Sequence, residues 1–392
     1  MELNLQNVKG TKDYMPEEQY TRNMIKNTLE NVFLRYGCKP LETPILNYYE
    51  VMASKYAGGA EILKEMYSVK NQGERDLVLR YDLTIPFAKV VGMNPNLRMP
   101  FKRYEIGKVF RDGPVKTGRL REFNQCDVDV VGIKSVMAEA ELMAMAIDIF
   151  NELELDVYIS YNNRKLLNGM ISSLNIENDM INSVILTLDK IEKLSKDEIM
   201  KELKEKNISE AAIFDLFKII DNKDSIDLSY FEEDELFKNN SLVKDGITEL
   251  KELEDLLNAL GIKSETKFNP FLARGLDIYT GTVYEIFLKD STIKSSIGSG
   301  GRYDKIIGKF LNSEKDYPAV GISFGLDVIF AALSLKNAAI RKSSTKFFVI
   351  PLGTEKECLK IVQSIRRKGY SAQMEMSKRR LRNSLDYVNK EG

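Results

Sequence analysis

Hydrophobic residues recur at helical spacing in two long segments of the chain. Between positions 16 and 36 apolar side chains return every three or four residues, and Gly37 follows as a stop signal. Positions 138–153 carry the same amphipathic pattern. Between 99 and 132 the period changes to two, with a polar, glycine-containing loop at 112–118. The pattern therefore predicts two helices and, between them, a long β-hairpin.

Proline and glycine residues mark further strands. The segment 40–46 contains two prolines within an extended pattern, which favours a strand at a sheet edge or an interface. Strand and glycine signals return over 267–288 and 294–301, and 318–335 predicts a strand followed by a helix. After a polar linker at 336–346, the remaining residues alternate strand, helix, strand and helix.

The charge distribution separates one module from the rest. Residues 201–260 hold 16 acidic and 8 basic residues, no proline and a helix-like pattern. Such a run is most simply a set of solvated helical faces, and we predict an inserted helical module over about 165–260. The predicted fold class is α+β, with a large domain over 1–335 and a small α/β domain over 346–392. Because a βαβα pattern normally continues to another strand, we expect the small domain to be incomplete and the chain truncated.

The chain contains no histidine among its 392 residues, which excludes Ser-His-Asp and Cys-His catalysis and histidine-containing zinc or iron sites. Three cysteines are too few for a four-thiolate cage, and their wide spacing favours a reducing compartment. No signal-peptide core or long apolar run occurs, so we expect a cytoplasmic protein with no membrane partner. A net charge of −1 implies no overall attraction to nucleic acid, although local patches can provide one.

The return strand of the predicted hairpin is the most informative segment. Alternate residues of a strand lie on the same face, so one face of this strand combines a cation, an aromatic ring, an amide and two carboxylates. These residues are Arg121, Phe123, Gln125, Asp127 and Asp129. Arg111 and Arg119 flank the loop. In a pocket, arginine binds phosphate oxygens, phenylalanine stacks on a base, and the amide and carboxylates bind a polar ligand group. A salt-bridged sheet face is the alternative, and spacing alone leaves both open.

Three other segments cluster polar residues or glycines. Arg274 lies in 272–282, beside an acid and glycines that allow close backbone approach. Residues 80–86 place an acid and a hydroxyl at a strand end before proline. The glycine-rich segment 297–304 lacks both the Rossmann and the P-loop spacing, and taken alone it predicts a structural turn.

Together these segments resemble the class II aminoacyl-tRNA synthetases, and specifically the histidyl-tRNA synthetase family. The resemblance runs from about residue 8 to the end and rests on segments in the family's order: Val8–Asp13, Pro40–Leu46, Arg80–Pro86, Lys108–Arg111 with Gly118–Gln125, Arg274–Gly281 and Gly300–Asp304. It implies an antiparallel sheet flanked by helices as a catalytic domain over 1–335, with a helical insertion. It also implies that 346–392 is an incomplete anticodon-binding domain.

The resemblance implies an activity as well. The family activates L-histidine with ATP and Mg²⁺ and transfers it to tRNA-His. It uses no prosthetic group and acts as a homodimer, joined through the strand at 40–46. By resemblance, the histidine-binding residues are Asp82, Leu83, Thr84, Gln125, Asp129, Tyr279 and Tyr303. The ATP-binding residues are Arg111, Arg119, Arg121 and Phe123, and Arg274 and Arg111 are catalytic. No side-chain metal site is expected.

Two positions depart from the family pattern. Val328 stands where the third class motif ends in an ATP-contacting arginine, so that contact is lost or Arg302 or Arg341 replaces it. Ile278 stands where a tyrosine is expected beside the imidazole site. These departures keep two alternatives open: a synthetase-like, histidine-sensing regulatory subunit of ATP phosphoribosyltransferase, and an inactive binding module. The intact Arg-Gly-Leu-Asp at 274–277 favours the ligase.

Overall fold

The computed structural model describes residues 5–53, 63–115, 118–191, 194–274, 278–311, 313–336, 345–377 and 379–391. Parts of three predicted features therefore lie outside the described residues: Gly275–Asp277, most of the linker at 336–346, and two positions of the hairpin loop. The chain forms two compact units, Met1–Thr11 with Ile25–Ala332 and Lys12–Met24 with Leu333–Gly392.

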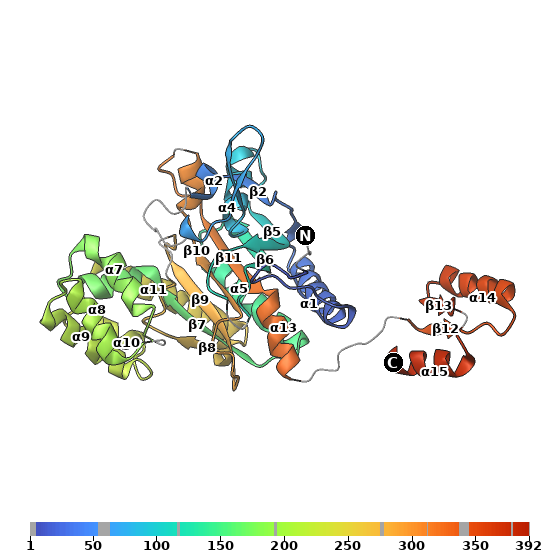
Figure 1. The fold of residues 1–392 in the computed structure, drawn as a ribbon. Helices are drawn as coiled ribbons and strands as arrows, with labels where there is room; N and C mark the ends of the chain where they lie inside the picture. The colour runs from blue at the N-terminus through green and yellow to red at the C-terminus, as the bar shows by residue number, and fades with distance from the viewer. Residues whose placement is uncertain are drawn as a thin grey trace. The chain divides into compact units, whose positions relative to one another are not determined.

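An eight-stranded sheet forms the centre of the first unit (Figure 1). In spatial order its strands are β1 (Lys39–Pro40), β5 (Phe101–Phe110), β6 (Glu122–Val131), β11 (Ala319–Gly325), β10 (Gly298–Arg302), β9 (Thr282–Leu288), β7 (Val157–Asn163) and β8 (Thr266–Phe268). Neighbouring strands are antiparallel, except that β1 runs parallel to β5 and β7 to β8. The predicted α+β class and hairpin are confirmed, and β1, which carries Pro40, lies at the sheet edge as expected. The segment 40–46 is not one strand, however, because β1 ends at Pro40 and Leu46 begins a strand of a separate sheet.

Two long helices cover one face of this sheet. They are α1 (Pro16–Arg35) and α5 (Met137–Glu152), and both were predicted from their periodicity. Phe33 of α1 and Phe150 of α5 each lie with their ring centroid 5.9 Å from that of Phe324 on β11. Because side chains alternate along a strand, the buried Cys126 and Val128 of β6 belong to this apolar face. The odd-numbered residues of β6 and β11 therefore point to the opposite face.

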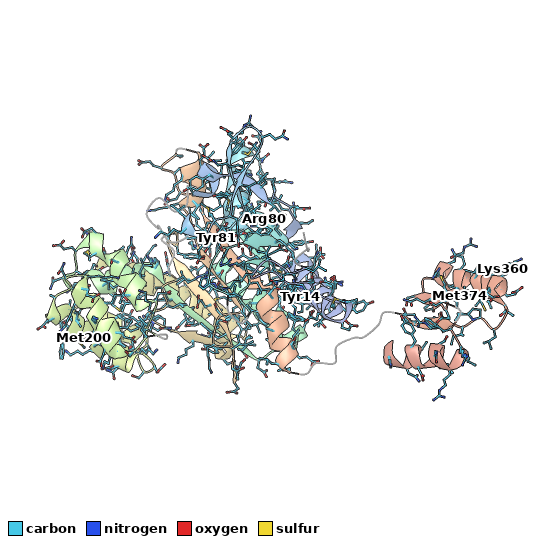
Figure 2. The ribbon with its side chains drawn as sticks, viewed as in Figure 1. Tyr14, Arg80, Tyr81, Met200, Lys360 and Met374 are labelled. Carbon is cyan, nitrogen blue, oxygen red and sulfur yellow. The ribbon has the colours of Figure 1, made fainter. Side chains whose placement is uncertain are left out.

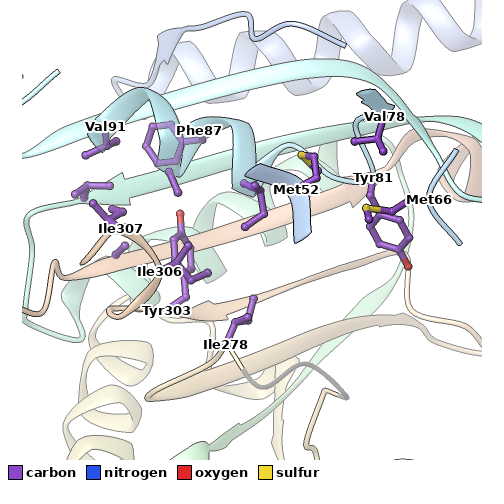
Figure 3. Packing of buried hydrophobic residues seen from close by; sticks show 14 residues of the cluster. Met52, Met66, Val78, Tyr81, Phe87, Val91, Ile278, Tyr303, Ile306 and Ile307 are labelled. Carbon is purple, nitrogen blue, oxygen red and sulfur yellow. The ribbon is translucent and has the colours of Figure 1, made fainter. Parts of the chain in front are cut away.

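A three-stranded sheet and short helices build a second layer on that opposite side. The strands are β2 (Leu46–Tyr48), β4 (Asp76–Leu79) and β3 (Ser68–Lys70), and the helices are α2 (Tyr49–Ala53), α4 (Thr84–Met93) and α12 (Ile306–Phe310). Apolar side chains of α2, α4, α12, β4 and adjoining loops form one buried cluster with Val131 of β6 and Ala319 of β11 (Figure 3). Tyr81, Ile278 and Tyr303 belong to the cluster and also reach a cavity described below. The packing of this layer thus positions the hydroxyl groups of Tyr81 and Tyr303 near the surface of the central sheet.

A run of helices follows β7 and returns to the sheet at β8. It comprises α6 (Arg164–Ser172), α7 (Asn178–Leu188), α8 (Lys196–Glu205), α9 (Glu210–Asn222), α10 (Leu228–Glu233) and α11 (Ser241–Ala259). Helices α6 and α11 approach so closely that a Cβ at Gly246 would lie 2.8 Å from Leu166 Cβ. The predicted helical character of 165–260 is confirmed, and its first helix starts directly where β7 ends.

The C-terminal residues follow the predicted order of elements. They form β12 (Phe347–Val349), α14 (Glu355–Arg367), β13 (Ala372–Met374) and α15 (Leu381–Glu391). The two strands pair in parallel, with Phe347 opposite Ala372, as a βαβ unit requires. Within the described ranges, no helix has both the length and the apolar character needed to cross a bilayer.

Candidate active site

A cavity of about 390 Å³ lies over the polar face of the central sheet. Nine of the twelve residues predicted from the family resemblance line it: Asp82, Thr84, Arg111, Arg119, Gln125, Asp129, Arg274, Tyr279 and Tyr303. They come from segments far apart in the sequence, which the sheet and the second layer bring together. The hairpin face therefore forms part of a pocket, which decides between the two alternatives that its spacing left open.

The floor of the cavity is a buried carboxylate held from two sides. Asp129 on β6 accepts a hydrogen bond from the Tyr303 hydroxyl at 2.5 Å, and its other oxygen lies 2.6 Å from Arg103 Nη2. Gly321 on the neighbouring strand makes room for it, since a Cβ there would overlap Asp129 Oδ1 and lie 2.9 Å from its Cγ. Burial raises the pKa of Tyr303 well above its usual value, so this hydroxyl remains a donor. The arrangement presents an oriented acceptor to a ligand.

Two further acceptors on β6 face the same cavity. Gln125 donates its amide N–H to Ser323 Oγ at 3.1 Å, and its Oε1 is buried without a protein hydrogen-bond partner. Asp127 is 3% exposed, and its Oδ1 also lacks such a partner. Burial raises the pKa of Asp127 to about 7, although the Arg103 guanidinium opposes the rise. Buried acceptors without partners are uncommon in proteins, so these oxygens favour a ligand that brings N–H donors.

The loop between β4 and α4 supplies the predicted amino-group ligands (Arg80 and Tyr81 of this loop are labelled in Figure 2). Asp82 Oδ1 accepts a hydrogen bond from the Ile85 backbone N–H at 3.0 Å, which anchors the carboxylate at the start of α4. Thr84 follows as the first residue of the helix. Leu83 does not line the cavity, and its side chain is fully buried. Its backbone carbonyl accepts a hydrogen bond from Arg103 at 3.0 Å.

The arginines of the hairpin occupy different environments. Arg111 Nε donates to the Tyr81 carbonyl at 3.2 Å, and the guanidinium lies 4.2 Å from the Tyr81 ring and 5.1 Å from the Phe123 ring. Phe123 thus stacks on Arg111 instead of lining the cavity. Arg119 is half exposed, with its Nη2 3.7 Å from Glu65 Oε1. This long contact leaves the Arg119 guanidinium accessible to an anionic ligand.

Arg121 braces the hairpin loop instead of lining the cavity. Its Nη1 lies 2.9 Å from Asp112 Oδ1, and its Nε donates to the Gly113 carbonyl at 3.2 Å. Its backbone N–H donates to Gly10 at 2.8 Å. Arg121 precedes β6, which begins at Glu122, so the period of two does not extend to it, and its side chain turns toward acceptors of the loop.

Arg274 reaches the cavity from a constrained segment. Its φ is 49°, a left-handed conformation that is uncommon for arginine. The buried Asn162 Nδ2 donates to the carbonyls of Pro270 at 2.8 Å and Leu272 at 3.1 Å. Arg164 Nη1 lies 3.4 Å from the Ala273 carbonyl. The end of β7 therefore holds the backbone that leads directly into Arg274.

The strand signal at 294–301 is confirmed, and the interpretation of the glycine-rich segment 297–304 as a structural turn is wrong. Gly298–Arg302 forms β10, between β9 and β11 in the sheet. A Cβ at Gly300 would overlap the Gly321 carbonyl and lie 2.6 Å from the Tyr284 ring. Glycine is needed here because groups from neighbouring strands approach closely. The local sequence cannot distinguish this need from the need for glycine in a turn.

The proposed replacement of the missing motif arginine by Arg302 is also wrong. Arg302 is 6% exposed and forms two 2.6 Å hydrogen bonds to the buried Glu139 of α5, so its charge is already neutralised. Arg341 lies outside the described residues. Val328, which stands where the family has an arginine, packs against Gly118. A Cβ at Gly118 would lie 3.3 Å from Val328 Cγ2. Ile278 lines the cavity as an apolar wall.

Some cavity residues were not predicted from the sequence. Glu65, Ser299 and Ser323 line the cavity. Ser299 lies within the glycine-rich segment 297–304, whereas Glu65 and Ser323 lie outside the segments on which the family resemblance rests. Asp127 lay on the predicted polar face but had no assigned role. Among the described residues, no group of three or more acidic, cysteine or histidine side chains converges as a metal site.

An antiparallel sheet flanked by helices, with a hairpin that brings arginines and carboxylates into one cavity, is the catalytic fold of a class II aminoacyl-tRNA synthetase. The profile of the histidyl-tRNA synthetase family matches residues 10–329. A histidine–tRNA ligase 1 from Bacillus cereus is 58% identical over 390 residues, which are 99% of this chain and 90% of that protein. The chain belongs to the histidyl-tRNA synthetase family and is an aminoacyl-tRNA ligase.

Solved structures share the fold along the whole chain. The crystal structure of histidyl-tRNA synthetase from a Nostoc species has a TM-score of 0.85 and 29% identity, covering 100% of this chain and 90% of that one. A Bacillus halodurans protein described as an ATP phosphoribosyltransferase regulatory subunit/histidyl-tRNA synthetase has a TM-score of 0.81, covering 99% and 97%. At 20% identity, the second similarity concerns the fold alone.

Proposed function

We propose that the protein is a histidine–tRNA ligase, which activates L-histidine with ATP and transfers it to tRNA-His. The single observation that carries the proposal is the cavity, which combines an oriented acceptor, Asp129, with the cations Arg111, Arg119 and Arg274. An amino acid that carries N–H groups and a nucleotide that carries phosphates together need this combination.

The activation step follows from the charges of the histidine carboxylate, the ATP phosphates and the arginines of the cavity. The histidine carboxylate attacks the α-phosphorus of ATP in line, a new C–O–P linkage forms, and pyrophosphate leaves. This step needs positioning and cations, and no general base, because the carboxylate is already ionised. Asp82, Thr84, Gln125 and Asp129 bind the amino group, while Tyr279 and Tyr303 line the pocket for the imidazole ring.

The arginines bind the nucleotide. Arg111 holds the α-phosphate and the carboxylate, and Arg274 stabilises the transition-state charge, as the family resemblance implies. Arg119 reaches the outer phosphates by leaving its long contact with Glu65. Arg121 and Phe123 act indirectly, through the hairpin loop and through the stacked Arg111. Mg²⁺ enters with the ATP phosphates, its usual ligands in such sites.

Several partners belong to the same proposal. The edge position of β1 and the exposed Ile45, Leu46 and Tyr48 beside it support a homodimer through the 40–46 segment. Residues 363–392 contain eight basic and three acidic residues, which suits contact with tRNA phosphates by an anticodon-binding domain over 346–392. We place the catalytic domain at 1–335, with its insertion over about 165–260, and the protein in the cytoplasm.

The proposal is tested by pyrophosphate exchange. We expect ATP–pyrophosphate exchange by the full chain to depend on L-histidine, and charging of tRNA-His to follow. Other amino acids, such as glutamine and phenylalanine, serve as controls and should give background exchange. Histidine binding without exchange would contradict the proposal and favour the regulatory-subunit alternative, to which the absence of arginine at Val328 points.

The two hydrogen bonds from Asn162 to the Pro270 and Leu272 carbonyls, which we call the Asn162 clamp, lead to a separate prediction. Asn162→Ala removes two hydrogen bonds that hold the backbone before Arg274. We expect histidine-dependent exchange to fall about 10-fold to 100-fold, since a displacement of about 1 Å at a reacting group has this effect. Histidine affinity, measured by calorimetry, should stay within about threefold.

The control for Asn162→Ala is Asn222→Ala, which alters an exposed amide of α9 that bonds only within its helix. It should keep the wild-type exchange rate. A folded Asn162→Ala protein with wild-type exchange would show that the clamp does not act on Arg274.

A further inference from the structure

Arg103 lies beneath the cavity, on β5, and has no exposed surface. Its Nη2 lies 2.6 Å from Asp129 Oδ2 and donates to the Leu83 carbonyl at 3.0 Å. Its guanidinium also lies 4.5 Å from the Phe87 ring of α4. The side chain therefore touches both the strand that carries Asp129 and the loop that carries Asp82 and Thr84, yet it does not line the cavity.

The charge of Arg103 is directed at the cavity carboxylates. Glu105 is two residues away, but it already pairs with Arg80 at 2.6 Å and accepts hydrogen bonds from Thr43. Its distance to Arg103 is 3.7 Å, which is longer than the contact with Asp129. Asp127 also acts on Arg103 through its charge. Arg103 is thus the cation that offsets the buried acids on β6.

A packing role explains this arginine poorly. Its Nε and Nη1 are buried without hydrogen-bond partners in the protein. Apolar side chains of similar volume often stabilise a fold as well as, or better than, a buried ion pair. A fully buried guanidinium with two unsatisfied nitrogens therefore points to a role in the site above it.

We propose that Arg103 is a positioning residue, which fixes the Asp129 carboxylate relative to the Asp82–Thr84 loop so that the two walls bind histidine together. This inference rests on the proposed function. Asp129 is already oriented by Tyr303 from one side, and Arg103 fixes its second oxygen. The same guanidinium holds Leu83, so movement of either wall is transmitted to the other.

The test compares Arg103→Met and Arg103→Lys in the full chain. We expect the Met variant to raise the histidine KM about 10-fold to 100-fold, as loss of a charged hydrogen-bond partner does, with kcat and the ATP KM within about threefold. The Lys variant keeps the charge and one contact, so its histidine KM should lie between those of the wild type and the Met variant. Lys102→Met, on the same strand but in a partly exposed ion pair, should leave all three constants unchanged.

A double-mutant cycle with Asp129→Asn separates positioning from stability. If Arg103 acts through Asp129, Arg103→Met should raise the histidine KM less than about threefold in the Asp129→Asn protein, which also removes the unpaired buried charge. An equal increase in both backgrounds, or a Met variant with the wild-type histidine KM, would overturn the inference. Absence of histidine-dependent exchange in the wild-type protein would instead refute the proposed function.

Discussion

Replacement of Arg274 by alanine is expected to lower histidine-dependent pyrophosphate exchange about 1,000-fold, because a cation that meets developing phosphoryl charge contributes about 10³–10⁵ in rate. Arg274 lines the cavity, with its guanidinium 5.2 Å from the Tyr279 ring and its Nε 3.9 Å from Glu285 Oε1. Neither contact neutralises the charge at short range. The guanidinium is therefore available to a phosphate, and the backbone that precedes the left-handed Arg274 is held by hydrogen bonds from Asn162 of β7.

The Arg274→Ala measurement has two parts. Histidine affinity by calorimetry should remain within about threefold, since the ring and amino-group ligands are untouched. Arg274→Lys should recover part of the rate, because lysine supplies the charge without the planar fork. Arg35→Ala, which breaks an exposed ion pair with Glu152, is the matched control and should show wild-type exchange. Exchange near the wild-type rate in Arg274→Ala would contradict the assigned role.

Local sequence patterns were sufficient for the long helices and the hairpin, but not for the three-stranded sheet and short helices of the second layer. Helices α1 and α5 and the β5–β6 hairpin follow periods of 3.6 and two that depend only on neighbouring residues. The same period correctly placed Gln125, Asp127 and Asp129 on the face that lines the cavity. Their partners could not be predicted in this way, because Tyr303 and Arg103 reach Asp129 from other elements.

The errors also have a physical cause. Glycine spacing at 298–301 resembles a turn locally, whereas these glycines actually accommodate the Gly321 carbonyl and the Tyr284 ring. Arg302 is a cation next to the cavity residue Tyr303 in the sequence, but in the fold it pairs with Glu139 of α5. A sequence shows the charge of a side chain but not which distant carboxylate neutralises it. Most of the site residues could be predicted from the resemblance to a family. Which charged side chains pair with one another could be determined only from the fold.

The Gly321→Ala substitution should remove the histidine site while leaving the fold. The added Cβ would overlap Asp129 Oδ1 and lie 3.1 Å from the Val128 carbonyl. Asp129 cannot move aside easily, because Arg103 and Tyr303 hold both of its oxygens. Displacing it breaks the hydrogen bond from Tyr303 to the charged carboxylate, worth about 1.5–3 kcal/mol, and the buried ion pair with Arg103. We therefore expect the histidine kcat/KM to fall at least about 100-fold, since about 1.4 kcal/mol corresponds to a factor of ten.

Gly325→Ala on the same strand is the matched control for Gly321→Ala. Its Cβ would lie 3.4 Å from Val328 Cγ2, 3.8 Å from Val328 Cβ and 3.9 Å from the Ile297 carbonyl, all ordinary contacts, so exchange kinetics should match the wild type. ATP affinity should be retained in both variants, because the arginines that bind phosphate come from other segments. If Gly321→Ala kept the wild-type histidine KM, Asp129 could not be the acceptor that binds the amino acid. The comparison therefore tests the floor of the cavity separately from the arginines that perform the chemistry.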